Sequence, residues 1–157
     1  MEPLKTDELT GLEVLTDATI AAVRAGSCLA YIDIVHFRDR VNAPFDHVVG
    51  DAVLAEVAWR LSDALAPWRV FRSGGDEFTV EVGTTLDRDG ARRLADRVAA
   101  ALAPPFGQTG EGLEATVGVC LRTVSDDPWR AWSAARRGAD VEAPRRGVRF
   151  WVDEDVA

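Results

Sequence analysis

The chain has 157 residues, 47% of them hydrophobic and 28% charged, which is the composition of one ordinary globular domain with its own core. Its formal net charge of -8 disfavours a nucleic-acid-binding surface, which needs a broad basic footprint. The opening residues are polar and acidic, unlike a signal peptide, and the apolar runs are shorter than a membrane span, so we expect a cytoplasmic protein.

The first third of the chain predicts a helix, a buried strand and an irregular segment. Apolar residues three to four positions apart predict a short helix over Val14–Arg24. The mostly apolar run Cys28–Val35 is typical of a strand buried on both faces, and it carries one acid, Asp33, near its end. Asparagine and proline interrupt Phe37–Phe45, which we expect to be irregular.

The remainder of the chain alternates helices with strands. We expect helices over Val48–Leu65, Asp87–Ala103 and Pro128–Arg137, and strands over Trp68–Arg72, Phe78–Val82, Leu113–Val124 and Val148–Val152. The second and third of the chain's strands flank the residues SGGDE and form a hairpin. This order predicts a single α+β domain over residues 1–157, ferredoxin-like or palm-type, with a central, mostly antiparallel sheet flanked by helices.

Cysteine and histidine form no disulfide or metal-binding pattern. Cys28 and Cys120 lie in apolar, strand-like runs, so we expect two buried free thiols. His36 and His47 lack the spacing of a zinc site and are interpreted as a loop residue and a satisfied polar contact.

The hairpin tip carries the main chemical signal of the sequence. Gly74 and Gly75 precede two adjacent acids, Asp76 and Glu77. Two glycines suit a type I′ turn, which needs positive φ twice, and they let an anion approach backbone N–H groups. A buried Asp33 beside these acids would be repelled by them unless a hard cation, Mg²⁺ or Mn²⁺, lay between them. Taken alone, such a tetrapeptide is usually a solvated turn; together with Asp33 it favours a site for a metal and a triphosphate.

Four segments in order resemble the GGDEF domain family, the diguanylate cyclases. RSGGDEF resembles the family signature, DELTGL its N-terminal wide turn, IDIVHFRDRVNAPFDHVVGDAVL its metal and nucleotide segment, and ATVGVC a later strand. The resemblance covers nearly the whole chain and implies the palm-type nucleotidyl cyclase fold. It also implies the reaction of that family, in which two facing domains condense two GTP into cyclic di-GMP and release pyrophosphate with the help of metal ions.

The resemblance assigns roles to individual residues. It implies that Asp33, the Ile34 carbonyl and Asp76 hold the metal, and that Asp76 accepts the proton of the ribose 3′-hydroxyl with Glu77 beside it. The residues that it implies for the nucleotide are Asn42, His47 and Asp51 for guanine and ribose, Arg38 for the phosphates, and the backbone of Gly74 and Gly75.

Around these positions the sequence departs from the family pattern. One residue more than the pattern has lies between Phe37 and Asn42. Val35 and Ala43 stand where the family has acids, and Asp46 stands where it has a glycine. The metal-binding acids are retained, but their surroundings have changed.

Two further motifs of the family are incomplete. The stretch LAPWRVF has no R-x-x-D, so the family's product-inhibition site is expected to be absent. The family pattern A-K-x-x-G-R corresponds to AARRGA, which places Ala135 and Ala139 on its basic positions and leaves Arg136 and Arg137 as the nearest substitutes.

Two classes of function follow from this comparison. The retained acids favour an active nucleotidyltransferase that uses GTP, or one with a changed base preference. The lost basic residues favour a catalytically silent domain that binds GTP or a partner protein. Residues 1–26 are too few for a sensor domain, so we expect the domain to pair with a second copy, to be paired by an unidentified sensor protein, or to derive from a longer chain.

Overall fold

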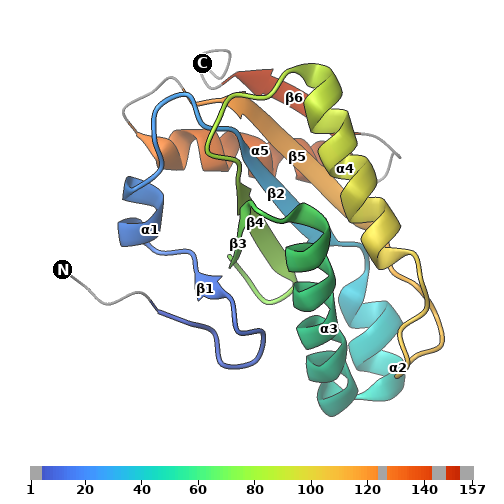
Figure 1. Ribbon diagram of the computed structural model, residues 1–157. Helices are drawn as coiled ribbons and strands as arrows, with labels where there is room; N and C mark the ends of the chain where they lie inside the picture. Colours follow the sequence, from blue (N-terminus) through green and yellow to red (C-terminus); the bar gives the residue numbers. More distant parts are fainter. Residues whose placement is uncertain (1–4, 124–126, 143–147, 153–157) are drawn as a thin grey trace.

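The structure is a computed structural model that describes residues 5–123, 127–142 and 148–152 (Figure 1). Its strands are β1 (Glu13–Val14), β2 (Leu29–Ile34), β3 (Arg69–Arg72), β4 (Glu77–Glu81), β5 (Ala115–Arg122) and β6 (Val148–Val152). Its helices are α1 (Asp17–Ala21), the π-helix η1 (Arg38–Asn42), α2 (Ala43–Phe45), α3 (His47–Leu65), α4 (Arg88–Leu102) and α5 (Pro128–Glu142).

All the strands belong to one sheet, in the order β1-β3-β4-β2-β5-β6. The pairs β3–β4, β4–β2 and β2–β5 are antiparallel, whereas β1–β3 and β5–β6 at the two edges are parallel. Figure 1 shows α3 and α4 in front of the sheet and α5 behind it. The predicted α+β fold, a mostly antiparallel sheet flanked by helices, is therefore confirmed.

The central strand β2 separates two hydrophobic clusters. Because side chains alternate along a strand, Ala30, Ile32 and Ile34 pack toward α3 and α4, whereas Leu29 and Tyr31 pack toward α1 and α5. All five are buried, which confirms a strand covered on both faces. Asp33 continues the row of Leu29 and Tyr31, so it lies on the α5 side of the sheet.

The two long helices follow their predicted apolar stripes. The expected stripe of α3 is buried, namely Leu54, Val57, Ala58, Leu61 and Leu65. The Val49 N–H donates to the Asp46 carboxylate at 3.0 Å, and the Gly90 N–H donates to Asp87 at 2.6 Å. These acids satisfy N–H groups that the first turns of α3 and α4 leave without helical partners.

Two predictions about local structure are wrong. The helix predicted over Val14–Arg24 is limited to Asp17–Ala21, because Glu13 and Val14 instead pair with Phe71 and Arg72 of β3. The segment predicted to be irregular, Phe37–Phe45, is helical through η1 and α2. In the first case a tertiary strand pairing overrides a weak local helix pattern. The last helix also extends further than predicted, to Glu142.

Both cysteines are buried thiols outside any disulfide, as predicted. Cys28 belongs to the cluster under α3 and α4, and Cys120 to the cluster under α5. Burial, with a smaller contribution from Cys120, raises the pKa of the Cys28 thiol, so this thiol stays neutral. Among the described residues, no helix has the length and hydropathy that a membrane span requires.

Candidate functional site

The acids of the signature meet at one end of β2 and β4. Asp33 lies directly opposite Glu77 in the antiparallel register, so their side chains share the α5 face of the sheet. The Ile34 N–H donates to the Asp76 carbonyl at 3.2 Å. The structure therefore brings together Asp33, Ile34, Asp76 and Glu77, which lie far apart in the sequence.

The loop between β3 and β4 is not the type I′ turn that two glycines suggest. Neither Gly74 nor Gly75 has a positive φ. The reason is that the loop spans residues 73–76, and its Ser73 and Gly74 N–H groups both donate to the Glu77 carbonyl, at 3.0 and 3.3 Å. Gly74 instead leaves room for the Glu77 side chain, because a Cβ there would lie 2.8 Å from Cδ of Glu77 and would displace its carboxylate.

Arg72 binds this loop and connects it to the N-terminal turn. Its Nε donates to the Gly74 carbonyl at 3.1 Å and its Nη2 to the Gly75 carbonyl at 2.8 Å. Its Nη1 donates to Asp7 at 2.8 Å, and this carboxylate also accepts from the Thr10 N–H and hydroxyl. Burial opposes ionisation of Asp7, but the hydrogen bonds from Thr10 and Arg72 outweigh it and lower the Asp7 pKa. The sequence shows Arg72 in the signature without revealing this clamp.

A second support reaches the loop from α5. The Trp132 indole N–H donates to the Thr79 hydroxyl at 2.9 Å, and that hydroxyl donates to Ser73, the first loop residue, at 3.0 Å. Tyr31 packs edge-on against Trp132. Burial raises the pKa of the Tyr31 hydroxyl, and its hydrogen bond to the Glu77 carboxylate raises this pKa further, so the hydroxyl stays a proton donor toward Glu77. Sequence reasoning missed both contacts, although a tyrosine two positions before Asp33 must share its face.

The residues expected to contact guanine and ribose cluster at the start of α3. Asn42 is half-buried at the end of η1, and its side-chain amide fills the space above Gly50; a Cβ on Gly50 would contact Asn42 Oδ1 and lie 3.2 Å from its Cγ. His47 and Asp51 are exposed in the first turns of α3. Gly50 was not predicted as a site residue, yet it is the position against which Asn42 rests.

The π-helix explains how the extra residue before Asn42 is accommodated. The Ala43 N–H donates to the Arg38 carbonyl, an i→i−5 bond whose turn holds one residue more than an α-turn. After it, the Asp46 N–H returns to the i→i−4 partner Asn42 at 3.0 Å. The insertion is thus absorbed locally, and Asn42 still reaches Gly50. Arg38, expected near the phosphates, is exposed at the start of this turn.

Asp46, which replaces a family glycine, has a backbone conformation that suits glycine. Its φ is 99°, in a region that L side chains rarely adopt. The carboxylate offsets part of this strain, because it accepts a hydrogen bond from the Val49 N–H and caps α3.

The structure also shows the residues that stand at the two incomplete family motifs, the basic motif in α5 and the product-inhibition motif before β3. Ala135 is fully buried, so α5 turns this position into the core, whereas Arg136 is exposed with its guanidinium 5.7 Å from the Trp132 ring. Ala139 lies outside the residues whose side chains are described. At the product-inhibition position, Trp68 is half-buried and the Arg97 guanidinium lies over its ring at 5.5 Å.

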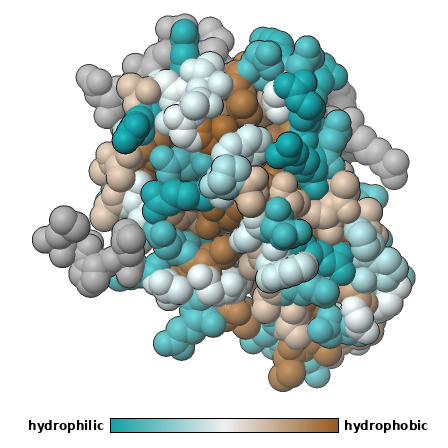
Figure 2. All heavy atoms as spheres, in the orientation of Figure 1, coloured by the Kyte–Doolittle hydropathy of each residue, from teal (hydrophilic) through white to brown (hydrophobic). Residues whose placement is uncertain are grey.

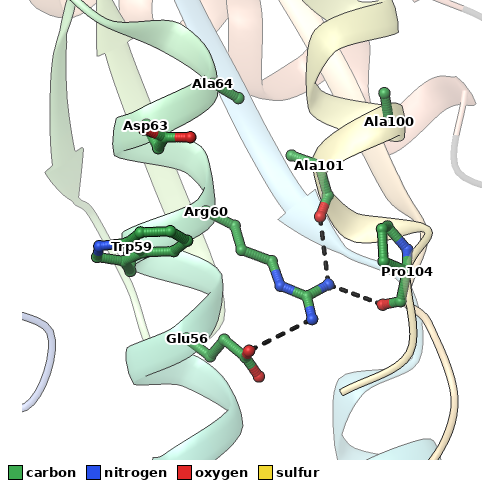
Figure 3. Close-up of a pocket in the computed structure, with 8 residues that line it drawn as sticks. All are labelled: Glu56, Trp59, Arg60, Asp63, Ala64, Ala100, Ala101 and Pro104. Carbon is green, nitrogen blue, oxygen red and sulfur yellow. Dashed lines mark hydrogen bonds and ion pairs between the residues drawn. The ribbon is translucent and has the colours of Figure 1, made fainter. Parts of the chain in front are cut away.

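The predicted donor set at the neighbouring ends of β2 and β4 fits a hard divalent cation. In residues 5–123, 127–142 and 148–152, no group of three or more His, Cys, Asp or Glu side chains is close enough to form a metal site alone. Two carboxylates and a backbone carbonyl, however, suit Mg²⁺, which completes its ligands with water and phosphate oxygens. A surface cavity of about 410 Å³ lies elsewhere, between α3 and α4, and none of its lining residues is a predicted site residue (Figure 3).

Comparison with known proteins gives a consistent result. The family model "Diguanylate cyclase, GGDEF domain" matches residues 6–140. The chain is 38% identical over 122 residues to diguanylate cyclase DgcP of Pseudomonas aeruginosa, which is 71% of this chain and 18% of that protein. It is also 38% identical over 167 residues to an uncharacterized signaling protein of Caulobacter vibrioides, covering 94% of this chain and 20% of that one. The chain thus spans about a fifth of the length of these relatives.

Among solved structures, the fold matches the diguanylate cyclase SiaD of Pseudomonas aeruginosa, determined in complex with its activator SiaC. The TM-score is 0.79 at 25% sequence identity, and the match covers 92% of this chain and 61% of SiaD.

Proposed function

The chain belongs to the diguanylate cyclase GGDEF domain family, and from this premise we propose that it condenses two GTP into cyclic di-GMP with release of pyrophosphate. The observation that carries the proposal is the pairing of β2 with β4, which places Asp33 opposite Glu77 and Ile34 against Asp76. Acids at the neighbouring ends of β2 and β4 suit a site that holds a divalent cation, and such a cation stabilises the negative charge that develops on phosphate oxygens.

In this proposal, Asp33, the Ile34 carbonyl and Asp76 hold Mg²⁺ or Mn²⁺. The ion would lower the pKa of the 3′-hydroxyl and stabilise charge on the leaving pyrophosphate. Asp76 accepts the proton of the 3′-hydroxyl. Glu77 stays oriented by the Tyr31 hydroxyl, and its carboxylate adds negative charge beside Asp76.

The nucleotide is held by residues on both sides of these acids. The Gly74 and Gly75 backbone approaches the triphosphate, and Arg72 fixes the loop by occupying the carbonyls of both glycines. Arg38 adds positive charge from η1. At the other end, the Asn42 amide and the acceptor-only Asp51 carboxylate suit the N1–H and N2–H₂ donors of guanine, with His47 at the ribose.

The reaction needs a second active site facing the first, because each domain presents one GTP. We propose that a second copy of this chain supplies it, in a dimer that can be transient. SiaD is known in complex with an activator protein, and control of this chain by a separate activator or sensor protein belongs to the same proposal.

A second candidate function is nucleotide binding without turnover. The observation that favours it is the burial of Ala135 at a position where the family has a basic residue. With Arg136 as the nearest exposed substitute, such a domain would bind GTP and act as a receptor or scaffold.

The deciding experiment incubates the protein with each of the four nucleoside triphosphates and Mg²⁺ or Mn²⁺ and analyses the products by mass spectrometry. We expect cyclic di-GMP from GTP, and none from the Asp33→Ala or Asp76→Ala variants, whose thermal unfolding should match that of wild type. GTP binding by calorimetry without any product would favour the receptor function. Undiminished metal-dependent GTP binding by both variants would contradict the two-carboxylate site.

A further inference from the structure

Two large apolar side chains of α3 are exposed on one face of that helix. Among the described residues, the large hydrophobic side chains left exposed are Phe45 (39%), Val48 (78%) and Trp59 (69%), all in α2 and α3. Val48 and Trp59 are separated by about three helical turns and therefore lie on the same side of α3. Figure 2 shows apolar atoms among hydrophilic ones on the face that α3 occupies in Figure 1.

The spacing along this face is that of a coiled-coil seam. We call Val48, Ala52, Ala55 and Trp59 the α3 seam; its members are four, three and four residues apart, as in the a and d positions of a heptad pattern. The seam is about 16 Å long at 1.5 Å per residue. Its two central alanines have short side chains, so a second helix can approach α3 closely. It lies opposite the buried stripe of α3, which the domain core already uses.

The charges that flank the α3 seam select the kind of helix that fits. Glu56 and Asp63 lie along one side of the seam and Asp51 along the other, at the positions that set partner choice in coiled coils. A second copy of this face would place acids against acids on a chain of net charge -8. The complementary partner is a helix with lysine or arginine beside its apolar stripe.

The nearest basic residue, Arg60, compensates only part of this acidity: its Nη2 pairs with the Glu56 carboxylate at 3.4 Å, and among the described residues it forms no ion pair with Asp63. Arg60 reaches from α3 toward α4, where it donates to the carbonyls of Ala101 and Pro104 at 3.3 and 2.7 Å, while Trp59 points away from α4 (Figure 3). The cavity of about 410 Å³ beside the seam has Trp59, Glu56 and Asp63 in its lining. An indole ring next to carboxylates suits the end of a long basic side chain.

We propose that the α3 seam is a docking site for a basic amphipathic helix of a partner protein. The apolar stripe of that helix packs on Val48, Ala52, Ala55 and Trp59, and its basic residues face Glu56 and Asp63. This surface does not include the acids at the ends of β2 and β4. Of the residues proposed for the nucleotide, Asp51 lies on the flank of the seam opposite Glu56 and Asp63, and the proposal holds whether or not the domain turns over GTP.

The test uses two labelled synthetic helical peptides of 18 residues, on the order of the α3 length. Both carry leucine at the a and d positions; one has lysine and the other glutamate at the flanking positions. Fluorescence anisotropy with the purified protein should show binding of the lysine peptide, with the glutamate peptide at least about tenfold weaker. Because a central Trp is often a dominant contact, Trp59→Ser should weaken the lysine peptide by about tenfold or more.

Charge variants distinguish specific docking from general attraction. Asp63→Lys should weaken the lysine peptide and strengthen the glutamate peptide, whereas Asp96→Lys, an equal charge change at an exposed position of α4, should leave both unchanged. Equal effects of the two variants, or unimpaired binding to Trp59→Ser, would overturn the proposal. So would sedimentation that shows a wild-type dimer dispersed by Trp59→Ser, since the occupant would then be a second copy of this chain.

Discussion

Replacing Gly50 by alanine should impair nucleotide binding without unfolding the domain. A Cβ at this position collides with the Asn42 amide oxygen and lies 3.2 Å from Asn42 Cγ, while the Phe37 ring at 3.8 Å is in ordinary contact. The colliding atom is the end of a side chain, so the amide rotates away and the backbone of α3 stays in place.

The expected magnitudes separate stability from binding. Gly to Ala inside a helix stabilises by up to about 1 kcal/mol, and turning Asn42 off its rotamer costs about 0.5–1.5 kcal/mol. The net change in unfolding free energy should therefore stay within about 1 kcal/mol. Losing the hydrogen bonds of the Asn42 amide to guanine should cost about 1–3 kcal/mol, which is a loss of about 5- to 150-fold in GTP affinity.

The assay is calorimetry with GTP and Mg²⁺ on Gly50→Ala, Asn42→Ala and the double variant. Because both changes act through one amide, Gly50→Ala should cost nothing further once Asn42 is alanine. Gly83→Ala is the matched control, since an added Cβ there meets no atom within 4 Å. Equal losses from Gly50→Ala in both backgrounds, or unchanged GTP affinity, would show that Asn42 does not act through its contact with Gly50.

Three further outcomes are expected. Arg60→Met should lower the free energy of unfolding by about 2–3 kcal/mol in urea titrations, because the carbonyls of Ala101, Pro104 and Pro105 lose a charged donor. Arg60→Lys should recover only part of this lost stability. Burial raises the pKa of Glu81 above its ordinary value of 4.5, although Arg69 opposes this. The ionised carboxylate therefore destabilises the fold above pH 4.5, so Glu81→Gln should raise the melting temperature at pH 7 but not at pH 3. Added cyclic di-GMP should not slow turnover at low micromolar concentrations, and a progress curve that bends under these conditions would reveal an inhibitory site.

Local patterns in the sequence were enough to predict most of the elements. The apolar stripes of α3 and α4, the two-sided burial of β2 and the hairpin around Gly74 and Gly75 depend on residues close in sequence, which side-chain periodicity reports directly. The sequence also suggested that Asp33 lies near Asp76 or Glu77, because an acid at the end of a buried strand needs a partner, and the register places it opposite Glu77.

Contacts between segments that lie far apart in the sequence were decided only by the tertiary structure, because no periodic pattern connects such segments. The pairing of Glu13 with Phe71 replaced a locally favoured helix, and the hydrogen bonds from the Ser73 and Gly74 N–H groups to the Glu77 carbonyl replaced the expected type I′ turn. The insertion before Asn42 was visible as one extra residue, but its absorption as a π-turn depends on the fit of Asn42 against Gly50. Such outcomes are set by packing between distant segments, whose free energy exceeds the small local preferences that a sequence pattern expresses.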